Sequence, residues 1–154
     1  MQYGPSAAAL LMKRRRISIS ASAYFAAALA IMLLPLNWVL GWLTAVAVHE
    51  FGHILALCVL RVTIFEIEIG IAGVKITTFE MKKLQELLCA AAGPIGSFSL
   101  LFYKEVFPAA AIIGSIQGMF NLLPIYPLDG GRIMNAAYLM IRDGIRNRKF
   151  PCKD

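Results

Sequence analysis

Four apolar runs separated by short charged segments constrain the fold of this chain more than any other feature. They span residues 17–36, 37–60, 84–103 and a stretch that begins near Val106. About twenty apolar residues in a helix can cross the roughly 30 Å hydrocarbon core of a bilayer. With 59% hydrophobic and only 16% charged residues, the chain has too little polar surface to cover itself in water. We therefore expect an all-α, polytopic membrane protein with about four transmembrane helices.

The positive charges of the chain set its expected orientation. The net charge is +6, and all of the 15 Lys and Arg side chains except Lys104 fall in clusters at residues 13–16, 61–83 and 132–153. These clusters alternate with the apolar runs, as cytoplasmic flanks do under the positive-inside rule. We expect a multi-pass protein with both termini cytoplasmic, and no binding to nucleic acid.

Three segments follow from this pattern. Residues 1–16 form a basic cytoplasmic amino-terminal segment, residues 17–145 a membrane core, and residues 146–154 a basic carboxyl-terminal tail. A cleavable signal peptide is the alternative for the first apolar run, but signal h-regions have only about 7–15 residues. We therefore expect a retained helix over residues 17–36. Residues 132–145 predict a short helix that lies along the membrane interface or is half-inserted.

The loop between the second and third runs has a different character. Residues 62–79, VTIFEIEIGIAGVKITTF, are rich in β-branched residues and alternate with period two around Glu66 and Glu68. This pattern predicts a short β-hairpin. Such a hairpin can bind an extended peptide by strand addition. The alternative is a structural connector that shields a loop facing the membrane.

The motif HEFGH, at residues 49–53, lies inside the second run and contains both of the 2 histidines of the chain. On a helix His49 and His53 share one face, so both imidazoles can bind a single ion. Glu50 lies about 100° around from His49, which suits a base that activates a water molecule. Zinc fits best, because it accepts imidazole and carboxylate ligands and has no redox chemistry. The alternative is polar residues that lock helices together, although a charged side chain at bilayer depth costs about 2.5–3.5 kcal/mol.

A catalytic zinc takes three protein ligands and keeps an open position, so a third ligand is required. Elimination among the 9 acidic residues leaves Asp129, in the segment PIYPLDGG at residues 124–131. Prolines and glycines interrupt a helix there, and open backbone at membrane depth needs protein or a water-filled cavity beside it. We predict that Asp129 points toward the HEFGH helix; capping of a helix that begins near Gly131 is the alternative. The 3 cysteines have no CxxC spacing and do not indicate a sulfur-ligated metal.

HEFGH in one run and FNLLPIYPLDGG in a later one resemble the site-2 protease family of intramembrane zinc metalloproteases (peptidase family M50). The resemblance is closest to the stage IV sporulation type, whose NxxPxxPxDG signature is present as Asn121, Pro124, Pro127, Asp129 and Gly130. It covers about residues 20–145. It implies hydrolysis of a membrane-spanning protein substrate within a bilayer, in a bacterial cell membrane, with release of a cytoplasmic fragment. It also implies that Asn121 lies near the zinc and holds the substrate or the developing oxyanion.

Two features depart from the family pattern. The turn Gly93-Pro94 matches a family element, but Ser97 stands where the family often has Asn, which predicts a weaker polar contact or none. Sporulation-type members generally continue into further membrane helices, whereas this sequence ends at Asp154.

Together these features predict a zinc metalloendopeptidase. His49, His53 and Asp129 would hold the zinc, and Glu50 would move a proton from the attacking water to the leaving amine. A membrane module that binds metal or client helices without cutting them is the alternative. A metal transporter would need a continuous polar path, for which the apolar runs supply few residues. The number of subunits stays open, and an oligomer is compatible with the sequence.

Overall fold

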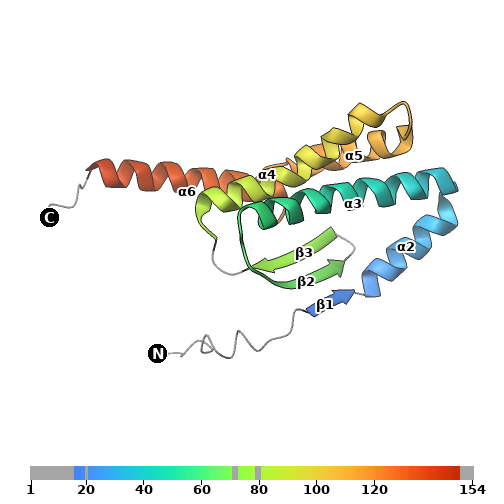
Figure 1. The fold of residues 1–154 in the computed structure, drawn as a ribbon, viewed down its shortest axis with the longest axis horizontal. Coiled ribbons are helices and arrows are strands. Elements are labelled where there is room, and N and C mark those ends of the chain that lie inside the picture. The colour runs from blue at the N-terminus through green and yellow to red at the C-terminus, as the bar shows by residue number, and fades with distance from the viewer. Residues whose placement is uncertain (1–15, 20, 71–72, 79–80, 150–154) are drawn as a thin grey trace.

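The protein is mostly helical. The computed structural model describes residues 16–19, 21–70, 73–78 and 81–149. Helices α3, α4 and α5 pack against one another, and α6 packs on α4 (Figure 1). The helices are α2 (Ala21–Leu33), α3 (Leu36–Val59), α4 (Lys83–Ser99) with its 3-10 continuation η1 (Leu100–Tyr103), α5 (Pro108–Asn121) and α6 (Asp129–Lys149). The predicted second, third and fourth runs correspond to α3, to α4 with η1, and to α5.

The two predicted basic terminal segments lie mostly outside the described residues. Of the segment 1–16 only Arg16 is described, and of the segment 146–154 only residues 146–149, which end α6. The short helix predicted over residues 132–145 is longer, since α6 begins at Asp129 and has 21 residues.

A three-stranded sheet accompanies the helices. Its strands are β1 (Arg16–Ile19), β2 (Ile64–Gly70) and β3 (Gly73–Thr78), in the order β1-β2-β3. Strands β2 and β3 pair antiparallel, with Ile67 opposite Ile76 and Ile69 opposite Val74, over the residues for which a hairpin was predicted. Strand β1 pairs parallel with β2 on the other side. The sheet lies along one side of α3, and β3 contacts that helix (Figure 1).

The prediction of a helix from residue 17 is wrong for residues 17–19. The predicted two-stranded hairpin is also incomplete, because the sheet has a third strand. Residues 16–19, RISI, form a strand, and their register places Ile17 beside Ile67 and Ile19 beside Ile69. Isoleucine is stiff at χ1 and suits a pleated surface better than a helix. Ile and Ser alternate with period two in this segment, which is typical of a strand. The segment was assigned to a helix because it begins a long apolar run. The helix begins only at Ala21, where alanine becomes frequent.

Two helices are long and apolar enough to cross a bilayer among the residues that the structure describes. They are Leu36–Val59, with 24 residues, and Lys83–Tyr103, with 21 residues. Helices α2 and α5 have 13 and 14 residues. At about 1.5 Å per residue each is roughly 20 Å long, which is shorter than the hydrocarbon core. Four crossings therefore stay a prediction.

The distribution of side chains suits a lipid environment. The core cluster consists of Ala45, Leu100 and Ala110, so small residues bring the helices close together. Large apolar side chains of α3 lie outside instead, among them Leu40, Leu43, Phe51 and Leu55. An apolar exterior around a core of small and polar side chains is what packing in a bilayer favours, where lipid tails solvate the exterior.

Candidate metal centre

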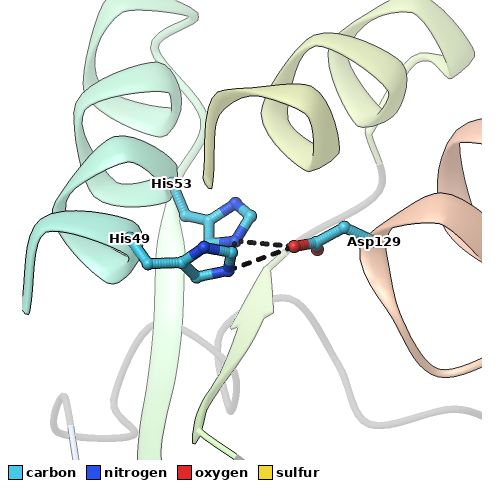
Figure 2. Close-up of side chains that lie close together, drawn as sticks. All are labelled: His49, His53 and Asp129. Carbon is cyan, nitrogen blue, oxygen red and sulfur yellow. Dashed lines mark hydrogen bonds and ion pairs between the residues drawn. The ribbon is translucent and has the colours of Figure 1, made fainter. Parts of the chain in front are cut away.

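The two histidines lie on the buried face of α3. Ala45, His49, His53 and Leu57 follow one another at intervals of four residues, and all four are buried. His49 is 3% exposed and His53 is 7% exposed. The helix thus brings both imidazoles to the same side, where they face α4 and α6 (Figure 2). Their ring centroids are 4.9 Å apart and their planes are nearly perpendicular.

Asp129 reaches the histidines from the start of α6. An irregular segment at residues 122–128 follows α5, and α6 begins at Asp129 itself. The next residue must be small, because a Cβ on Gly130 would overlap the carbonyl of Leu122. This turn directs the Asp129 carboxylate at the two imidazoles (Figure 2), and the residue is only 7% exposed. The third residue that elimination selected therefore lies beside the HEFGH histidines.

The spacing of the three donor atoms fits a tetrahedral metal ion. The Oδ2 atom of Asp129 lies 3.3 Å from Nε2 of His49 and 3.2 Å from Nε2 of His53. The two Nε2 atoms are 3.3 Å apart. Ligands that bind zinc at about 2.0–2.1 Å in a tetrahedral arrangement are separated by about 3.3 Å. The three residues present can therefore hold zinc without rearrangement of their donor atoms.

The other ring nitrogens of the histidines contact α4. Nδ1 of His53 donates a hydrogen bond to the carbonyl of Cys89, at 2.8 Å. Because a carbonyl only accepts, Nδ1 carries a proton, and Nε2, the atom that faces Asp129, is the ring nitrogen available to bind a metal ion. Nδ1 of His49 lies 2.8 Å from Oγ of Ser97, a residue that is fully buried. Such contacts orient metal-binding histidines and fix their tautomers.

The contacts of Ser97 and Cys89 with the histidines were not assigned from the sequence. Serine at position 97 predicted a weaker polar contact than the family's Asn would make, or none, and its hydroxyl lies beside Nδ1 of His49. The contact of His53 is to a backbone carbonyl, which every residue has, so no side-chain pattern could indicate it. For the contact with His49, the one signal in the sequence was that Ser97 is a polar residue inside an apolar segment.

Two further predicted residues lie near the cluster. Nδ2 of Asn121, the last residue of α5, is 3.3 Å from Nε2 of His49. Glu50 follows His49 on α3 and is half-buried. Helix geometry places its side chain about 100° around from that of His49, so it borders the cluster. All five predicted site residues therefore belong to elements that meet at this point.

Gly93 shows that space is reserved between the two rings. A Cβ at this position would overlap Nε2 of His53 and would lie 2.9 Å from Nε2 of His49. Gly93 is buried on α4, so its missing side chain leaves room at the atoms that would bind an ion. A glycine here is a requirement of the site and not only of helix packing.

Replacing Gly93 with Ala is expected to abolish metal binding at this site. The added methyl would displace the His53 ring, so metal affinity should fall by more than the about 10–100-fold that loss of a supporting contact costs. Zinc content of the purified protein measures the effect. Gly144→Ala on α6 is the matched control, because a Cβ there meets nothing within 4 Å. Full zinc content in the Gly93 variant would contradict this assignment.

Comparison with known families gives a match over the carboxyl-terminal half of the chain. Residues 76–151 match Peptidase family M50. The matched segment contains Gly93, Asn121 and Asp129 but begins after HEFGH. The comparison with curated protein sequences gives no match.

The fold is similar to that of a solved membrane protease. The Site-2 Protease from Methanocaldococcus jannaschii superposes with a TM-score of 0.65 at 24% sequence identity. The superposition covers 79% of this chain and 66% of that chain. At this sequence identity the likeness establishes the fold alone. The activity has to be inferred from the side chains of the site.

Proposed function

We propose that this chain is an intramembrane zinc metalloprotease of the site-2 protease type, which hydrolyses a peptide bond in a membrane-spanning protein. One observation carries the proposal: His49, His53 and Asp129 bring three donor atoms within 3.2–3.3 Å of one another, although the two motifs are far apart in the chain. The family match over residues 76–151 and the fold likeness support the same class of enzyme.

In this proposal His49, His53 and Asp129 hold the zinc. The ion would supply a Lewis acid that brings the pKa of a water molecule close to neutrality. Ser97 and the carbonyl of Cys89 keep the imidazoles in place from α4. Gly93 keeps the space between the rings open.

Glu50 is the proposed general base. It accepts a proton as the water oxygen attacks the scissile carbonyl carbon, and it returns that proton to the nitrogen when the C–N bond breaks. Asn121 lies beside His49 and its amide nitrogen can donate a hydrogen bond to the oxygen that becomes negative. The products are a new carboxyl end and a new amino end, with one water consumed.

The substrate helix must open before it can be cut, since its carbonyls are shielded by helical hydrogen bonds. Strand addition to the sheet is the proposed way to hold the opened segment. Strand β3 lies at an edge of the order β1-β2-β3 and contacts α3, the helix that carries the histidines. An extended segment paired with β3 would therefore lie near the cluster.

Orientation and biological class are part of the same proposal. Four crossings with cytoplasmic ends would place the cluster toward the cytoplasmic side of the membrane, because Arg61 lies two residues after the end of α3. The Asn121 to Gly130 signature further points to the stage IV sporulation type, and so to a bacterial membrane and to sporulation signalling.

The test is cleavage of a membrane-spanning substrate by the purified chain in detergent or vesicles. We expect cleavage that stops when a chelator removes zinc and returns when zinc is added back, because the water is inactive without the ion. Fragment masses measured with and without chelator give the result. Bound zinc without cleavage of any of a panel of transmembrane segments would instead favour a module that binds metal or client helices without cutting them.

A further inference from the structure

Arg132 sits between two carboxylates near the cluster. It lies one turn into α6, and its Nη1 is 3.8 Å from Oδ1 of Asp129. On the other side its Nε is 3.9 Å from Oε1 of Glu86, which belongs to α4. The Arg132 side chain is 29% exposed, so it is partly buried. Both contacts are ion pairs, and together they join the start of α6 to α4.

The two oxygens of Asp129 have different partners. Oδ2 faces both histidines, at 3.3 and 3.2 Å, while Oδ1 faces Arg132. The terminal torsion of an aspartate is broad and turns at little cost. A fixed positive charge beside one oxygen therefore selects one orientation of the carboxylate, with the other oxygen toward the imidazoles.

We propose that Arg132 is a positioning residue, which holds Oδ1 of Asp129 so that Oδ2 is presented to a metal ion between His49 and His53. Glu86 supports it by holding the guanidinium from α4. Arg132 therefore does more than add a cytoplasmic positive charge. The inference depends on the proposed metal site but not on proteolysis.

A second ion pair between the same two helices provides a control. Lys83 of α4 hydrogen-bonds Asp143 of α6, which lies far along the helix from Asp129. This hydrogen bond lowers the pKa of the Asp143 carboxyl, so the carboxyl is charged at neutral pH. Lys83→Met removes a bridge between α4 and α6 without touching the cluster. Arg132→Met removes a bridge and the contact to Asp129.

The experiment measures binding of Co²⁺ alone to the full chain, purified in detergent and stripped of metal. Competition with a chelator gives the affinity, and the visible absorption of Co²⁺ reports its ligand geometry. Arg132→Met should weaken Co²⁺ affinity by about 10–100-fold and alter the absorption bands, as loss of an outer partner of a ligand does. Lys83→Met should leave both unchanged. Arg132→Lys, which keeps the charge, should recover part of the affinity, and Glu86→Gln should weaken it less than Arg132→Met.

A double variant tests whether Arg132 acts through Asp129. If it does, Arg132→Met should cause no further loss in a protein that already carries Asp129→Asn. Independent losses in the double variant would overturn the proposal, as would equal losses from Arg132→Met and Lys83→Met. Wild-type affinity and spectrum in Arg132→Met would also overturn it, while leaving the proposed protease intact. Failure of the wild type to bind Co²⁺ would overturn the metal site itself.

Discussion

Glu50→Gln is expected to bind zinc as the wild type does and to lose cleavage by about 10²–10⁴-fold, the range that a general base contributes. The amide has nearly the same shape as the carboxylate, so α3 and both histidines should keep their places. It cannot accept the proton of the attacking water, because an amide is not a base at neutral pH. The measurements are zinc content and the rate of substrate cleavage, both on the same preparation.

Glu105→Gln is the matched control for this variant. Glu105 is an exposed carboxylate whose contact is an ion pair with Lys104, distant in sequence from the cluster. It should retain both zinc and cleavage. An unchanged cleavage rate in Glu50→Gln would end the mechanism proposed for this residue. Loss of zinc together with cleavage would show that Glu50 supports the site and does not act as its base.

Asp129→Ala is expected to reduce zinc from about one ion per chain to almost none. A zinc site of this kind needs three protein ligands, and removal of Asp129 leaves only two imidazole ligands, whose Nε2 atoms lie 3.3 Å apart. The loss should exceed the about 10–100-fold that removal of a supporting residue costs. Metal analysis of the purified variant beside the wild type measures it.

Asp143→Ala tests whether the loss of zinc is specific to position 129. It also removes a carboxylate from α6, but one whose contacts are to Lys83 and Arg142. We expect normal zinc content in this variant. Equal zinc in Asp129→Ala and wild type would show that the ion, if bound, has another third ligand.

The helices and the placement of the site residues could be predicted from the sequence to different extents. The segment that carries HEFGH was expected over residues 37–60 and forms α3, because its length and apolar character leave no other structure in a bilayer. Elimination among few acidic residues led to Asp129, since carboxylates are rare enough in this chain for each to be examined. The roles of these residues stay predictions until metal and cleavage are measured.

Other features depend on tertiary contacts that local patterns do not carry. Strand β1 was hidden inside an apolar run, because its pairing with β2 joins segments more than forty residues apart. Arg132 was grouped with the charges that set orientation, yet it contacts Asp129. The predicted turn at Gly93-Pro94 is wrong, because both residues lie inside α4. Only the packing of α4 against the two rings explains why a side chain is not tolerated at Gly93.

The packing of α4 has a consequence for how the molecule is held together. Both α3 and α6 pack on α4, and the histidines of α3 meet the aspartate of α6 across it. An ion shared by these side chains would act as a crosslink between α3 and α6. Assembly of the helices and occupancy of the centre would then be thermodynamically linked, each favouring the other. The same three side chains would then both bind the catalytic ion and stabilise the tertiary structure.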